Sequence, residues 1–146
     1  MYDGRLATDE KLAVRTVARL ARVLECALDD LSLPQYRVLA AVDDGGERAT
    51  HLAAGLALAK PTVTAAVDGL VERGYLTRAP EPADRRAVRI ALTPAGRKAL
   101  ARAEAAMAGR LAHVLETAAD GPAALATLAA LAPSLGGPGT RAKAAP

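Results

Sequence analysis

The sequence has no phenylalanine, no tryptophan and only three tyrosines, although 51% of its 146 residues are hydrophobic. Alanine, leucine and valine therefore supply the apolar content, and that mixture favours helices over sheets. Because each alanine buries little area, the core of one chain is expected to be thin. Packing against a second copy would bury more apolar surface, so we expect an obligate oligomer.

Cysteine is scarce and long hydrophobic runs are absent. The single cysteine, Cys26, cannot form an internal disulfide, and we expect it to be a packing residue rather than a redox sensor. No apolar run of about 18 residues and no signal segment occurs, which predicts a soluble, cytoplasmic protein without a membrane partner. A chain of 146 residues fits a single domain, 1–146.

Motifs for catalysis and metal binding are missing as well. The sequence has no glycine-rich phosphate loop and no nucleophile–base pattern, so no enzyme and no cofactor are predicted. Its two histidines, His51 and His113, are far apart and have no neighbouring ligand set. We therefore expect no metal site.

The charge that is present is unevenly distributed. The net charge is +3 and the isoelectric point is about 9.4, which favours a polyanionic partner. Between residues 60 and 97, seven lysines and arginines face four carboxylates. This segment is the expected site of nucleic-acid binding.

The first third of the chain predicts two helices. Apolar residues recur at three- and four-residue steps from Thr8 to Leu31, which predicts one long amphipathic helix. Ser32 and Gln35 have the spacing of a capping box, and Pro34 stands where its missing N–H does no harm. These signals predict that a second helix begins here, and paired glycines end it.

Two short helices joined by a tight turn are expected next, which indicates a helix-turn-helix. Thr50 is expected to cap a helix that runs to about Leu56, and Pro61 begins a helix that Gly74 closes. An apolar stripe in the second of these helices predicts which residues point outward. They are Thr62, Thr64, Ala65 and Asp68.

A hairpin and two further helices complete the pattern. Residues 75–78 and 88–92 are predicted strands on either side of a proline-stiffened basic loop, as in a wing. Thr93 and Pro94 open a long helix, and a short one ends near Ala132. We predict a mainly α fold with a small β wing: a winged helix-turn-helix at 33–92, dimerisation helices at 1–32 and 93–132, and a disordered tail at 133–146.

The run from Thr50 to Leu100 resembles the MarR family of winged helix-turn-helix transcription factors. Its sharpest motif is Asp84-x-Arg86, then Leu92-Thr93 after five residues, followed by Gly96. The segment 33–36, Leu-Pro-Gln-Tyr, also resembles the start of the family's second helix. The resemblance implies a homodimer that binds a palindromic operator in double-stranded DNA and acts as a repressor. In the family the signal is often a small molecule or an oxidant, and here we expect release by a small-molecule effector.

The resemblance also assigns roles, with two departures from the family pattern. In the family the aspartate of the motif, here Asp84, orients an arginine and stiffens the wing. Ala57 and Ala59 stand where the family commonly has a turn glycine and a helix-capping serine or threonine. Ala65 replaces a common base-reading arginine, which predicts modest sequence discrimination.

Several residues are candidates for DNA contact. The start of the recognition helix offers hydroxyls to bases and a positive dipole to phosphate, and the wing arginines suit a narrow minor groove. The alternative is that these residues are simply solvated. The predicted set is Thr50, Lys60, Pro61, Thr62, Thr64, Ala65, Arg73, Arg78, Asp84, Arg85, Arg86 and Arg89.

An effector is expected between the dimer helices and the DNA-binding unit, because a ligand there can favour one spacing of the recognition helices. Leu28, Tyr36 and Leu39 are the residues expected to line such a pocket. A winged-helix module that contacts protein rather than DNA is the alternative function.

Overall fold

The computed structural model describes residues 7–45 and 48–135, without the side chains of residues 49 and 50. The chain is mainly helical with one antiparallel hairpin, which confirms the predicted fold class. The elements are α1 (Thr8–Glu25), α2 (Leu33–Asp43), α3 (Ala49–Leu56), α4 (Lys60–Glu72), β1 (Leu76–Glu81), β2 (Asp84–Leu92), α5 (Pro94–Glu116), α6 (Gly121–Ala130) and the 3-10 helix η1 (Ala132–Leu135).

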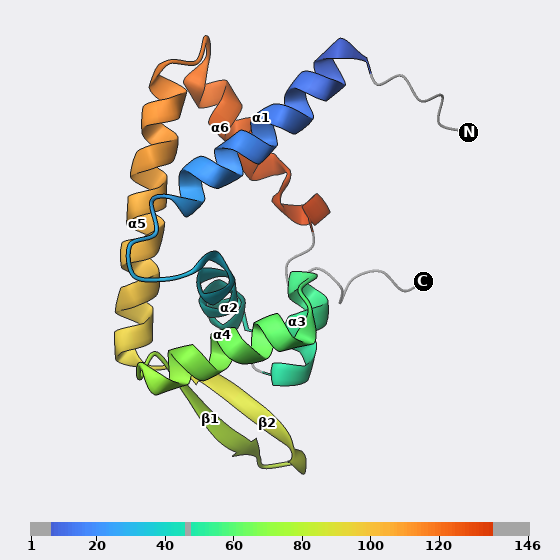
Figure 1. The fold of residues 1–146 in the computed structure, drawn as a ribbon, viewed down its shortest axis with the longest axis vertical. Helices are drawn as coiled ribbons and strands as arrows, with labels where there is room; N and C mark the ends of the chain where they lie inside the picture. The colour runs from blue at the N-terminus through green and yellow to red at the C-terminus, as the bar shows by residue number, and fades with distance from the viewer. Residues whose placement is uncertain (1–6, 46–47, 136–146) are drawn as a thin grey trace, which may run out of the picture.

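The elements divide between the two ends of α5. Figure 1 shows α1 and α6 at one end of this long helix, and α2, α3, α4 and the hairpin at the other. The short helix η1 occupies residues 132–135, so the predicted tail does not begin at residue 133. The rest of that tail lies outside the described residues.

Local capping signals were predicted correctly. The Gln35 backbone N–H donates to Ser32 Oγ at 3.2 Å, and the Ser32 backbone N–H donates to Gln35 Oε1 at 3.1 Å. At the start of α5, the Gly96 N–H donates to Thr93 Oγ1 at 3.0 Å. Each bond satisfies a backbone donor that has no partner inside its helix, which fixes where α2 and α5 begin.

The first helix is shorter than its apolar pattern predicts. It ends at Glu25, and after the cap residue Cys26 the amides of Ala27 and Leu28 bond back only three residues. The chain then turns so that Leu31 enters the core of the α2–α4 unit. The apolar spacing continued past the helix end because Leu31 is buried against a different set of partners.

The start of α3 also differs from the prediction. Arg48 precedes the helix without a side-chain hydrogen bond, and Thr50 is already the second helical residue, so Thr50 is not the cap. Its side chain lies outside the described residues. Arg37 of α2 instead ties down the other end of α3, by donating to the carbonyl oxygen of Leu56.

The hairpin strands are longer than predicted. They pair from Leu76 with Leu92 to Glu81 with Asp84, with an irregularity beside Pro80. A proline is tolerated here because a two-stranded sheet leaves each strand one edge that faces away from its partner. Most of the predicted loop is therefore strand.

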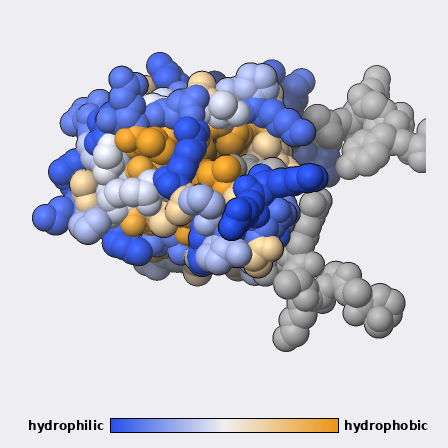
Figure 2. Space-filling model, turned by 90° about the horizontal axis from the view of Figure 1, so that it is seen from below, coloured by the Kyte–Doolittle hydropathy of each residue, from blue (hydrophilic) through white to orange (hydrophobic). Residues whose placement is uncertain are grey.

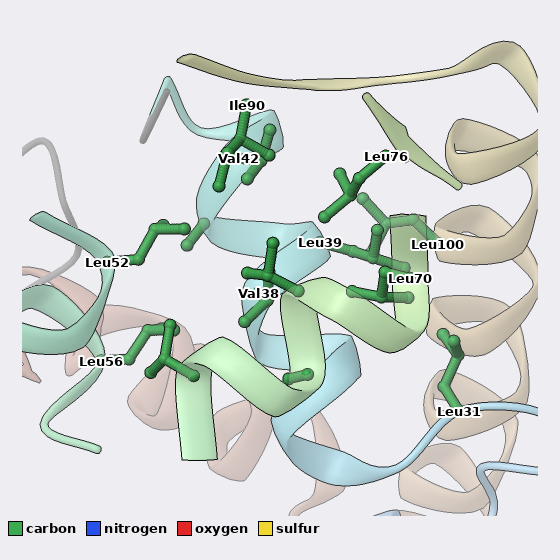
Figure 3. Packing of buried hydrophobic residues seen from close by; sticks show 14 residues of the cluster. Leu31, Val38, Leu39, Val42, Leu52, Leu56, Leu70, Leu76, Ile90 and Leu100 are labelled. Carbon is green, nitrogen blue, oxygen red and sulfur yellow. The ribbon is translucent and has the colours of Figure 1, made fainter. Parts of the chain in front are cut away.

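The core lies between α2, α4 and the hairpin. Val38, Leu39, Leu70 and Ile90 are fully buried, and Leu76 is nearly so. In Figure 3 these side chains point toward one another from the two helices and the two strands. This core holds α4 and the hairpin at fixed positions at one end of the molecule.

Candidate nucleic-acid interface

The recognition helix α4 presents one face to the core and another to solvent. Its buried residues are Val63, Ala66, Val67 and Leu70. The candidate contact residues all lie on the exposed face, as predicted. They are Lys60, Pro61, Thr62, Thr64 and Ala65.

The turn that leads into α4 carries backbone strain. Ala57 has a φ of +51°, a left-handed conformation that costs a residue with a Cβ about 1–2 kcal/mol. Ala59 caps α4 without a side-chain hydrogen bond. Both alanines identified from the sequence therefore stand where glycine and a hydroxyl residue would be favoured.

The wing is stiffened by Asp84, whose Oδ1 accepts a hydrogen bond from the Arg86 backbone N–H at 3.0 Å. The bond spans two residues and shapes the start of β2. The side chains of Arg85 and Arg86 are exposed, and within the described part of the chain neither forms an ion pair. Their guanidinium groups are available to an anionic partner.

The glycine of the motif has a steric role. A Cβ at Gly96 would lie 2.1 Å from the carbonyl oxygen of Tyr75, so only glycine allows α5 to begin this close to β1. Nearby, Thr93 Oγ1 donates to the carbonyl oxygen of Gly74 at 2.6 Å. The motif thus joins the end of α4, the wing and the start of α5.

Arg73 and Arg78, two of the candidate residues, form ion pairs with aspartates of the same chain. Arg78 of β1 pairs with Asp68 of α4, which ties the wing to the recognition helix. Arg73, the residue that caps the end of α4, pairs with Asp30 through Nη2 and Oδ1 at 2.5 Å. Arg89 is exposed on β2.

Asp30, Arg73 and Tyr75 form a cluster that was not predicted from the sequence. The Tyr75 hydroxyl donates to Asp30 Oδ2 at 3.0 Å, and Arg73 lies 4.7 Å above the Tyr75 ring. Tyr75, and then the charge of Arg73, lower the pKa of the Asp30 carboxyl below its usual value. Asp30 and Arg73 are 43 residues apart, so local spacing in the sequence gives no signal of their contact.

The three predicted effector residues do not share a cavity. Leu28 lines a cavity of about 130 Å³ next to Arg102, whereas Tyr36 lines a larger one of about 420 Å³. Leu39 is fully buried in the core. Cys26 is exposed, so the expectation that it packs is wrong within one chain.

The surface at this end of the molecule is largely hydrophilic. Figure 2, which views the wing end from below, shows hydrophilic residues around a smaller apolar area. A short helix, a turn, an outward-facing second helix and a basic hairpin together define a winged helix-turn-helix protein.

Sequence comparison finds a similarity to one known family. Residues 29–87 match the model of the MarR family. The match covers the winged helix-turn-helix but fewer than half of the 146 residues, so this part of the chain is similar to the MarR family. No curated protein matches the sequence. Among the described residues, no helix is long and apolar enough to cross a membrane.

Solved structures of similar proteins have the same fold. A MarR-family regulator from Rhodococcus sp. RHA1 is 23% identical, with a TM-score of 0.71 over 88% of this chain and 95% of that one. MarR from E. coli is 20% identical, with a TM-score of 0.74 over 90% and 98%. CouR from Rhodococcus jostii RHA1, bound to p-coumaroyl-CoA, is 26% identical, with a TM-score of 0.65 over 83% and 87%.

Proposed function

We propose that the protein is a repressor that binds a palindromic operator in double-stranded DNA as a homodimer. The observation that carries this proposal is the outward face of α4, with Lys60, Thr62 and Thr64, at the same end of the molecule as the wing, where Arg85 and Arg86 are exposed (Figure 1). A helix of this kind fits the major groove, and an arginine hairpin fits the adjacent minor groove.

The exposed apolar helices at the other end support a homodimer. Leu12, Val14 and Val17 of α1 and Leu125 of α6 are large apolar residues that one chain leaves exposed. Two-fold symmetry then sets the spacing of the two half-sites at about one helical turn, roughly 10 bp. A dimer bound at a promoter excludes polymerase without any activating surface.

Control by a small molecule is part of the proposal. CouR, which has the same fold, binds p-coumaroyl-CoA. In this chain a cavity between α1, α2 and α5 is in a position where a ligand can bias the spacing of the two recognition helices.

The test is a DNA titration at several salt concentrations with operator, selected from genomic fragments, and scrambled duplex. Arg85→Ala and Arg86→Ala should each reduce the slope of log affinity against log salt by about one unit per protomer, because only a cation displaces counterions. Thr62→Ala should reduce discrimination between the duplexes by about 1 kcal/mol and leave the slope unchanged.

The matched control is Arg15→Ala, which removes an exposed arginine from α1 at the opposite end. It should leave both affinity and slope unchanged. Unchanged affinity in both wing variants would overturn the DNA-binding proposal and favour a module that contacts protein.

A further inference from the structure

A shallow cavity of about 420 Å³, open to solvent, lies between α1, α2 and α5, and its lining is almost entirely apolar. Two polar side chains interrupt its apolar lining: Tyr36 from α2 and Glu104 from α5. The lining residues are Ala21, Leu24, Leu33, Tyr36, Glu104, Met107, Ala108 and Leu111. A concave apolar site with a few convergent polar groups from different elements is the usual form of a small-ligand site.

The charge in this cavity is negative. None of the described residues that line it is a lysine, arginine or histidine. Within the described residues, Glu104 also makes no ion pair or hydrogen bond with another side chain. Glu104 is exposed, so water screens its charge, but it is the one ionised side chain among the described residues of the lining and can accept a charge-assisted hydrogen bond from an ammonium group.

The second polar group is a hydrogen-bond donor. Tyr36 is half-buried, and burial, together with the Glu104 and Asp44 carboxylates, raises the pKa of its hydroxyl. The hydroxyl therefore keeps its proton at neutral pH. It can orient a ligand, but it does not compensate the Glu104 charge.

We propose that this cavity binds an apolar molecule with a cationic amine head, which pairs with Glu104 while its apolar body lies against Leu24, Leu33 and Met107. The role of this ligand as the effector rests on the proposed function, whereas its binding does not. The ligand class is opposite in charge to the acyl-CoA bound by CouR.

The test uses three probes with one apolar body and different heads: phenylbutylamine, phenylbutanol and phenylbutyrate. Calorimetry on the full chain without DNA should show the amine binding about tenfold more tightly than the alcohol, with the acid weakest. This order would oppose the overall charge of +3, so it would report the local field of Glu104.

Glu104→Gln should bring the affinities of amine and acid together, by weakening the amine about tenfold and strengthening the acid. The matched control is Glu116→Gln, which removes the other α5 carboxylate, outside this cavity. It should leave the order of the probes unchanged. Because Glu104 is exposed, neither variant threatens folding.

Three results would overturn the proposal. They are tighter binding of the acid, an amine preference that survives Glu104→Gln, and no binding by any probe, as when a second copy fills the cavity. Amine binding that fails to release DNA would instead contradict the effector role in the proposed function and leave the ligand class standing.

Discussion

The winged-helix unit and the two helices at the other end of α5 have similar apolar residues, but only the winged-helix unit buries them. We call these two helices, α1 and α6, the arm helices. In α2 and α4 the apolar residues are buried in a common core, but α1 and α6 bury none of theirs. Helix α5 passes between the two surroundings: Ala99 and Leu100 are buried near its start, and nothing is buried after Met107. Apolar content alone therefore does not make a core, because a partner surface must also be present.

The largest effect on stability is expected from a substitution in the core. Leu39→Ala should lower the free energy of unfolding by about 2–5 kcal/mol, because it leaves a cavity at a fully buried site. Urea denaturation measures the loss. Val88→Thr, at an exposed position on the wing, should change stability by less than about 0.5 kcal/mol. Equal losses in the two variants would contradict the assigned core.

Substitutions in the arm helices should instead weaken the dimer. Val14 and Val17 are 63% and 60% exposed and three residues apart, so they share one face of α1. Replacing both with glutamate should weaken the dimer at least about hundredfold, because each apolar side chain buried at an interface contributes about 1.5–3 kcal/mol.

Sedimentation at several concentrations measures this shift. Val88→Glu makes the same kind of substitution, with one added carboxylate, at an exposed apolar position on the wing and should leave the dimer intact. A double α1 variant that stays dimeric at micromolar concentration would show that another surface joins the two copies.

A smaller effect is expected within the winged-helix unit, where the turn before α4 is strained. Ala57→Gly should raise stability by about 0.5–1 kcal/mol, since relief of the left-handed conformation exceeds the entropy that glycine adds to the unfolded chain. Ala54→Gly, three residues earlier and inside α3, should lower stability by about 1 kcal/mol. Thermal melting of the two variants measures both changes in stability. If both variants lost stability, the conclusion that Ala57 is strained would be wrong.

The same contrast explains what could be predicted from the sequence. The caps at Ser32 and Thr93 were predictable because each joins residues only three apart. The end of α1 was not, because the position of Leu31 depends on partners that come later in the chain. The Asp30–Arg73 pair was missed for the same reason.

The candidate site divides in the same way. The exposed face of α4 follows from helical periodicity, so Thr62 and Thr64 could be assigned from spacing. Arg73 and Arg78 form ion pairs with Asp30 and Asp68. These pairs depend on tertiary contacts, which residue spacing in the sequence cannot reveal. Their contact with DNA remains a prediction.

The smallest effect is expected where the connection from α1 to α2 contacts the segment between α4 and β1. Asp30 lies in the connection from α1 to α2, and its partners Arg73 and Tyr75 lie between α4 and β1. Asp30→Asn removes the charge and should lower the free energy of unfolding modestly at neutral pH. Asp29→Asn is the matched control, because among the described residues Asp29 forms no ion pair.

The pH dependence gives this prediction its sign. The hydrogen bond from Tyr75 and the charge of Arg73 lower the pKa of the Asp30 carboxyl below 3.8 in the folded chain. The folded state therefore favours the carboxylate, and the stabilisation is fully present above pH 3.8 and disappears as the pH falls through the lower folded value. Urea denaturation should show the native chain and Asp30→Asn diverging above pH 3.8 and converging below it. If the two free energies of unfolding differed by the same amount at every pH, the Asp30 carboxylate would stabilise this contact by its shape and not by its charge.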